Sequence, residues 1–121
     1  MTTVELKAQT KDFALRVIRL VDALPTSVKG RVIANQIIRS ATSVAANYRA
    51  ACRALFRVEF IAKIGVVEEE ADETAFWLEL IIDSKIRSKA HIEPLLKEAG
   101  ELMAIMVASR KSAIANRKSA I

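Results

Sequence analysis

Apolar side chains recur every three or four residues through most of this chain, which is the spacing of one face of an α-helix. The first such stripe consists of Leu6, Phe13, Val17, Leu20 and Leu24. Pro25 ends it, because the residue before a proline avoids helical geometry. Thr26 or Ser27 can then cap a second helix by accepting a backbone N–H bond. We expect this second helix to run from about Val28 into the low fifties.

Two further stripes predict two more helices. The third runs from about residue 57 to 84 and repeats Phe60, Ile64, Val67, Ala71, Thr74, Leu78 and Ile82. Residues 86–94 are typical of a connection, because a proline such as Pro94 is tolerated only near a helix start. The fourth stripe consists of Leu95, Ala99, Leu102, Met106 and Ser109. Short connections favour antiparallel neighbours, so we predict an all-α, antiparallel up-down-up-down four-helix bundle.

The 121 residues are enough for one domain, with only 3 Gly and 2 Pro among them. We assign the bundle to residues 1–115 and a basic C-terminal tail to residues 116–121. The pentapeptide RKSAI occurs at 110–114 and again at 117–121. This seven-residue spacing would place both copies on one face of a continuing helix, and a solvated tail is the other interpretation.

Several classes of function are disfavoured by what the sequence lacks. The N-terminus does not have the pattern of a secretion signal, and no uncharged apolar run is long enough to span a membrane. A lone Cys52 cannot form an intrachain disulfide, and we expect a cytoplasmic protein. One His and three Gly assemble neither a catalytic set nor a phosphate-cradling loop, so we expect no enzyme and no cofactor. A di-metal bundle needs paired Glu-x-x-His motifs, whereas Ser88 precedes His91 by three, so we expect no metal.

Charge is distributed unevenly along the chain. Residues 1–67 carry 11 basic and 4 acidic side chains. Residues 68–84 carry 7 acidic side chains and no basic one, and residues 85–121 carry 8 basic and 3 acidic side chains. A basic helix is therefore followed by an acidic one. This pattern predicts a charged partner, either nucleic acid or a second copy of the chain.

A helical-wheel projection divides the second helix into three faces. The core face consists of Ile33, Ile37, Ala41, Val44, Tyr48 and Ala51. Beside it lies a polar strip, for which we expect hydrogen bonds between helices, made of Gln36, Ser40, Ser43 and Asn47. Roughly opposite the core lie the candidate nucleic-acid-binding residues Arg31, Arg39, Arg49, Arg53 and Arg57. A merely solvated surface is the alternative for these arginines.

The third helix has more apolar surface than one four-helix core can bury. Val66, Trp77 and Leu80 lie outside the core stripe, and an exposed Trp with aliphatic neighbours usually marks a protein interface. We predict that these three residues form an oligomer interface. The acidic cluster at residues 68–73 should lie beside arginines of the same or a neighbouring subunit.

The segment QIIRSATSVAANYRAACRALFRVEFIAKIGVVEEEADETAFWLELI resembles the four-helix-bundle proteins of the 23S ribosomal RNA intervening-sequence type. The positions that carry the resemblance are Gln36, Arg39, Ser40, Ser43, Asn47, Arg53, Phe60, Glu69 and Glu73. One position departs from the pattern: Phe56 stands where relatives usually have Ser, which removes an N-cap from the third helix.

The resemblance implies a bundle that assembles as a homo-oligomeric ring, commonly a homopentamer, with no enzymatic activity. A similar bundle is the accessory protein of reverse transcriptases in diversity-generating retroelements, where it engages nucleic acid and the polymerase. Two functions remain open. The first is weak, sequence-tolerant binding of RNA or DNA, as an accessory to RNA-related machinery or to a nucleic-acid-processing protein. The second is a protein scaffold whose acidic and basic stripes pair between subunits.

Overall fold

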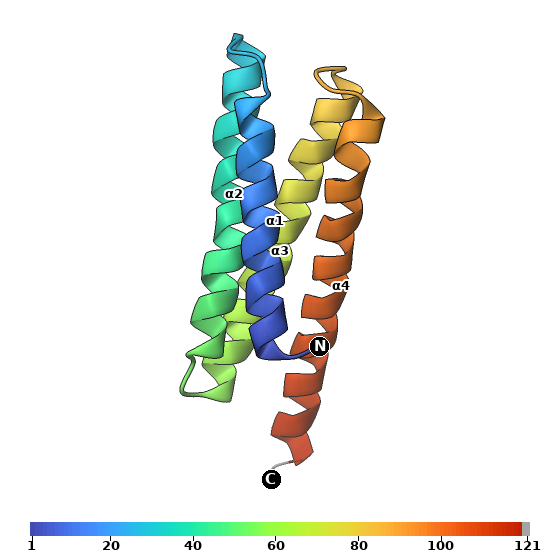
Figure 1. Cartoon of the computed structure of the whole chain (residues 1–121). Helices are drawn as coiled ribbons and strands as arrows, with labels where there is room; N and C mark the ends of the chain where they lie inside the picture. The colour runs from blue at the N-terminus through green and yellow to red at the C-terminus, as the bar shows by residue number, and fades with distance from the viewer. Residues whose placement is uncertain (120–121) are drawn as a thin grey trace.

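The computed structural model describes the backbone of residues 1–119 and the side chains of residues 1–116. It contains four helices: α1 (Thr3–Asp22), α2 (Val28–Cys52), α3 (Arg57–Asp83) and α4 (Lys89–Ser119). They lie alongside one another in a single bundle, with short connections at alternate ends (Figure 1). Within the described residues there is no strand, so the all-α class and the four helices are confirmed. No described helix is both long and apolar enough to cross a membrane.

The helix starts follow from their capping residues. The Thr2 hydroxyl accepts a 3.1 Å hydrogen bond from the Glu5 backbone N–H and caps α1. Of the two candidate caps for α2, Ser27 is the one used, and it accepts from the Gly30 N–H at 3.3 Å. The connection passes so close to α2 that a Cβ on Gly30 would overlap the Pro25 carbonyl oxygen. Glycine is therefore required at this buried position.

Phe56 precedes α3 in an extended conformation, with φ −119° and ψ 145°, and makes no side-chain capping bond. The predicted loss of the N-cap at this position is confirmed. Phe56 is 71% exposed and the adjacent Leu55 is 87% exposed, so neither aromatic nor aliphatic burial replaces the missing cap.

The prediction of a connection at residues 86–94 is wrong. Helix α4 begins at Lys89, and Pro94 lies inside it. Its first turn is closed by a bond from the His91 N–H to the Ser88 carbonyl (3.1 Å), and Ile92 is completely buried in the core. Burial of this side chain favours helix ahead of the proline despite one lost backbone bond. Helix α4 continues to Ser119 and so enters the segment 116–121, of which residues 120–121 lie outside the described backbone.

The core confirms the predicted buried face of α2, since all six of its residues are buried. In α3, Ile81 is completely buried, whereas Ile82 of the predicted stripe is only partly buried. In α4 the stripe is buried except for Ser109, which is partly exposed. Helix α3 packs extensively against α2 and α4, while α1 rests mainly on α2 and touches α4 at few positions. Two clefts follow from this arrangement, one on either side of α1.

Candidate nucleic-acid interface

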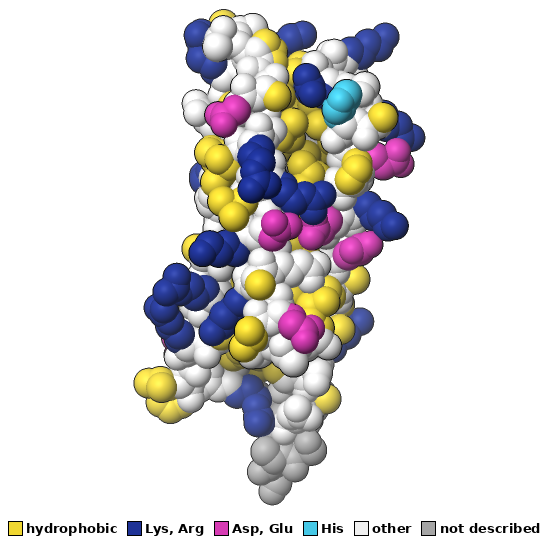
Figure 2. Space-filling model, in the orientation of Figure 1, with side chains coloured by type: hydrophobic (Ala, Val, Ile, Leu, Met, Phe, Trp, Pro, Cys, Tyr) yellow, Lys and Arg dark blue, Asp and Glu magenta, His cyan; other side chains and the backbone are white. Residues whose placement is uncertain are grey.

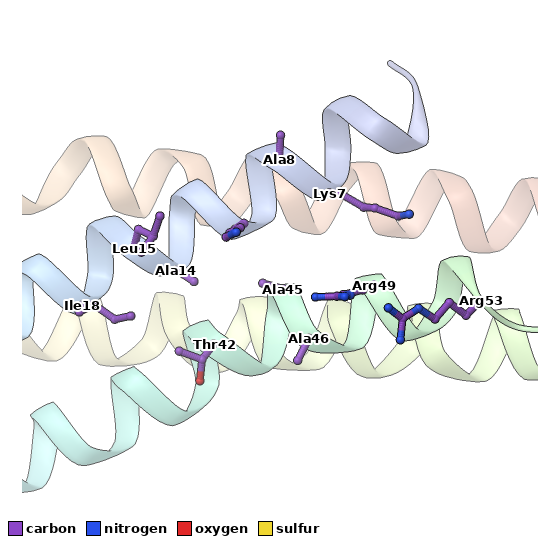
Figure 3. A pocket seen from close by; sticks show the side chains of 11 residues that line it. Lys7, Ala8, Ala14, Leu15, Ile18, Thr42, Ala45, Ala46, Arg49 and Arg53 are labelled. Carbon is purple, nitrogen blue, oxygen red and sulfur yellow. The ribbon is translucent and has the colours of Figure 1, made fainter.

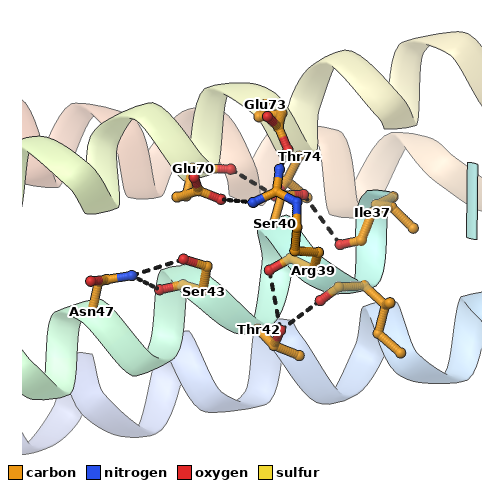
Figure 4. A network of polar contacts seen from close by, with 10 residues as sticks. Ile37, Arg39, Ser40, Thr42, Ser43, Asn47, Glu70, Glu73 and Thr74 are labelled. Atoms are coloured by element: carbon orange, nitrogen blue, oxygen red, sulfur yellow. Dashed lines mark hydrogen bonds and ion pairs between the residues drawn. The ribbon is translucent and has the colours of Figure 1, made fainter. Parts of the chain in front are cut away.

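One of the five predicted arginines, Arg39, forms ion pairs with α3. Its guanidinium pairs with Glu70 at 3.2 Å and also with Glu73 (Figure 4). Arg110 of α4 pairs with Glu68 at 3.1 Å. The prediction that the acidic cluster lies beside arginines is confirmed, and the arginines belong to the same chain. Among the described residues, no three His, Cys, Asp or Glu side chains are placed to hold a metal ion.

The polar strip of α2 makes one contact between helices. Ser40 and Thr74 are completely buried, and the Thr74 hydroxyl lies 2.9 Å from the Ser40 hydroxyl across the α2–α3 seam. Each hydroxyl also reaches a carbonyl of its own helix. Asn47 instead bonds along α2, donating to the Ser43 hydroxyl at 2.8 Å (Figure 4). Gln36, the remaining member of the strip, is partly exposed.

Arg49 and Arg53 line a hollow of about 620 Å³ between α1 and α2. Lys7 and Lys11 approach the same hollow from α1, and the side chains of Lys7, Arg49 and Arg53 gather at one end of it (Figure 3). The rest of the lining is small or apolar and consists of Ala8, Ala14, Leu15, Ile18, Thr42, Ala45 and Ala46. We call this site the basic groove.

No acidic residue lines the basic groove. In the part of the chain that the structure describes, none of its four cations forms an ion pair. Figure 2 shows Lys and Arg side chains gathered over the lower half of α1 and α2. Like charges held over a low alanine floor create a positive potential that attracts anions.

The other predicted arginines do not line the groove. Arg31 is exposed and lies 18 residues before Arg49, which is about 27 Å along the helix axis. Arg57 is exposed at the start of α3 and lines a different hollow beside the α2–α3 connection. The five arginines are therefore not one surface. Sequence reasoning missed Lys7 and Lys11, although their spacing of four residues on the outer side of α1 was a usable signal.

The outer face of α3 differs from the prediction in one respect. Trp77 is not an exposed anchor but is partly buried and packs against the core. The exposed aromatic is Phe76, at 50%, which meets the Trp77 ring edge to face with centroids 5.1 Å apart. Val66 is 38% exposed and Leu80 is partly exposed. We define the outer face of α3 as Val66, Glu69, Asp72, Phe76 and Leu80.

Tyr48 lies in the core, only 4% exposed. Burial raises the pKa of its phenol well above the usual range, and a hydrogen bond with Cys52 acts in the same direction. Because the ring is buried, it is unavailable for stacking on bases. No aromatic side chain lines the basic groove, so the site offers charge without a stacking platform.

Residues 3–108 match the sequence profile of a family described as 23S rRNA-intervening sequence protein. A crystal structure from Bacteroides thetaiotaomicron VPI-5482, described as a protein with unknown function from the S23 ribosomal protein family, is also similar. It is 33% identical, with a TM-score of 0.82, and the alignment covers 87% of this chain and 97% of that chain. No protein with a curated description matches. The profile match spans both helices of the basic groove.

Proposed function

We propose that this chain, which belongs to the 23S rRNA-intervening sequence protein family, binds nucleic-acid phosphates weakly through the basic groove. In this proposal it is a non-enzymatic accessory to RNA-related machinery. The observation that carries the proposal is the unequal pairing of the arginines. Arg16, Arg39 and Arg110 each have a carboxylate partner within the chain, whereas the four groove cations have none within the described residues.

The chemistry of the groove favours binding without sequence readout. Lys and Arg heads on long side chains can follow a phosphate backbone, and phosphate contacts position a protein without identifying bases. The alanines at Ala45 and Ala46 keep the floor low, so a strand can approach α2 closely. Because no aromatic ring lines the groove, RNA and DNA of any sequence should bind alike at this site.

Assembly is the second part of the proposal. We infer that the helices alternate up and down and that the bundles associate into a closed ring through the outer face of α3, with the pentamer that the family resemblance implies as the expected subunit number. Its half-exposed Phe76 supplies the kind of aromatic contact that anchors protein interfaces. A ring repeats the basic groove in every subunit, and several weak contacts then act together on one strand.

One observation favours the alternative function, a protein scaffold. The outer face of α3 combines apolar side chains with the exposed carboxylates of Glu69 and Asp72. The basic groove combines an apolar floor with four cations. One subunit's α3 could therefore occupy the next subunit's groove, and the charges would then be used in assembly rather than on nucleic acid.

An Arg49→Gln/Arg53→Gln variant separates the two functions. Fluorescence anisotropy with a labelled duplex would be followed from about 50 to 300 mM salt, the range in which phosphate binding weakens steeply. The logarithm of the binding constant falls linearly with the logarithm of the salt concentration, with a slope of about −0.9 per phosphate contacted. Loss of two phosphate contacts should therefore make this slope shallower by about 1.8. The matched control is Lys29→Gln/Arg31→Gln, which removes the same charge from exposed positions at the other end of α2.

If the basic groove binds nucleic acid, the Arg49→Gln/Arg53→Gln variant should lose duplex binding and keep the wild-type sedimentation coefficient. The Lys29→Gln/Arg31→Gln control should bind the duplex nearly as the wild-type protein does. A groove variant that falls apart into monomers supports the scaffold. Absence of binding by wild-type protein at about 50 mM salt would refute the nucleic-acid function, since screening is weak there.

A further inference from the structure

A second cleft, of about 400 Å³, lies between α1 and α4 at the end of the bundle opposite the two termini (Figure 1). Its floor is apolar and consists of Leu20, Ala23, Pro94 and Leu95, and its polar lining consists of Arg16, Arg19, Arg87 and His91. We call it the α1–α4 cleft. It shares no residue with the basic groove. In Figure 2 the single histidine, in cyan, lies at this end beside cationic and apolar surface.

Two of the three arginines in this cleft lack an anionic partner. Arg16 pairs with Glu98, a neighbour on α4. Neither Arg19 nor Arg87 forms an ion pair with any described residue. The Nε atom of Arg87 is also buried without a hydrogen-bond partner among the described residues. A buried guanidinium donor is costly without an acceptor, and a bound anion would supply one.

His91 is held at the rim by its neighbour. The Ser88 hydroxyl lies 2.6 Å from the His91 Nδ1 atom, so this nitrogen is engaged and Nε2 is left to bind a ligand. The charge of the cleft also indicates what it would hold. Arg19 and Arg87 together balance a dianion, whereas a carboxylate would neutralise only one of them. A phosphate monoester carries about −1.5 to −2 at pH 7 and offers three acceptor oxygens.

We propose that the α1–α4 cleft binds a small organic phosphate monoester. The phosphate contacts Arg19, Arg87 and His91, and a compact apolar group covers Leu20 and Leu95. The volume of the cleft and its apolar floor with a few convergent polar groups are typical of small-molecule sites. This inference does not depend on nucleic-acid binding by the basic groove.

Phenyl phosphate is the probe, with inorganic phosphate and benzoate as comparisons. Because the chain has one histidine, a single imidazole Hε1 signal in the NMR spectrum reports on the cleft. We expect phenyl phosphate to shift this signal saturably. It should bind about tenfold more tightly than inorganic phosphate, because its phenyl ring buries roughly 55 Å² of apolar surface that inorganic phosphate lacks. Benzoate, with half the charge, should bind more weakly than phenyl phosphate.

Three variants complete the test. Arg87→Gln and Arg19→Gln should each weaken phenyl phosphate binding about tenfold or more, as expected for lost charge-assisted bonds. Arg19 is exposed, so its replacement tests the site without disturbing the fold. Arg53→Gln, in the basic groove, should bind phenyl phosphate with wild-type affinity, even if its affinity for nucleic acid falls. The inference is wrong if the signal does not saturate below about 10 mM, a weak limit for a specific site, or if Arg19→Gln binds phenyl phosphate unchanged.

Discussion

Replacement of Gly30 by Ala should destabilise the protein, although the same change in a free helix stabilises it. An Ala side chain would overlap the Pro25 carbonyl oxygen and lie 3.1 Å from the Pro25 Cγ atom. The connection must then move, which disturbs the Ser27 cap and the burial of Leu24, now 8% exposed. Losing the cap costs about 1 kcal/mol, and exposing a leucine costs about 1.5–3 kcal/mol.

The helical preference of Ala offsets about 1 kcal/mol of this loss. The net destabilisation is therefore about 1.5–3 kcal/mol, or roughly 6–12 °C in Tm for a chain of this size. Gly100→Ala is the matched control, because Gly100 is exposed in α4 and a Cβ there meets nothing within 4 Å. This control should raise Tm by about 2–4 °C.

Thermal unfolding followed by circular dichroism, at one protein concentration for all variants, measures both effects. The comparison depends on sign as well as size, since the two variants make the same chemical change inside a helix. A Gly30→Ala protein as stable as the Gly100→Ala protein would refute the argument that the Pro25 carbonyl excludes a side chain at this position.

Two further predictions concern Phe56 and Tyr48. Phe56→Ser should raise the free energy of unfolding by about 1 kcal/mol, because the backbone already has capping geometry and a serine hydroxyl can supply the missing bond. Removing the exposed phenylalanine ring sacrifices little buried surface. An unchanged urea midpoint would contradict this prediction. Since the folded state raises the Tyr48 pKa, its stabilising contribution is complete below pH 10, roughly the unfolded pKa, and declines above it. Tyr48 is the one tyrosine of the chain, so phenolate absorbance reports only on it. As the pH rises, this absorbance should appear together with the loss of helical circular dichroism. A Tyr48 phenol that ionises near pH 10 while the protein is still folded would count against this.

The helices were predictable where local chemistry and burial agree. Ser27 follows a proline that ends α1, and its hydroxyl caps α2 as the sequence indicates. Ile37 and Val44 lie on one face of a helical wheel, and both are completely buried. Phe56 is an informative case, because the absence of a hydroxyl in the sequence corresponds to the absence of a capping bond in the structure.

Features that depend on contacts between helices were not predictable from one helix at a time. Pro94 suggested a connection, but burial of Ile92 extends α4 ahead of it. Phe76 and Trp77 are adjacent, and tertiary packing decides that the tryptophan is partly buried and the phenylalanine half exposed. The basic groove joins residues more than forty positions apart, so no single helical wheel contains it.

The placement of ion pairs explains why the basic groove is the most informative surface of the molecule. Arg39 joins α2 to α3, Arg110 joins α4 to α3, and Arg16 joins α1 to α4. Three of the seven carboxylates at residues 68–84 are thus paired with arginines of the same chain. The α1–α2 seam differs, because among the described residues no ion pair crosses it and cations face it from both helices.

Exposed ion pairs contribute about 0–1 kcal/mol each, so this sorting matters little for stability. It matters for recognition, because it leaves four cations, unpaired within the described residues, facing one another across the α1–α2 seam. Four like charges oppose one another there, and a bound polyanion would remove that repulsion. A ligand that binds only the folded state also stabilises it. The seam that no ion pair of the described residues crosses is therefore the one at which we propose that nucleic acid binds.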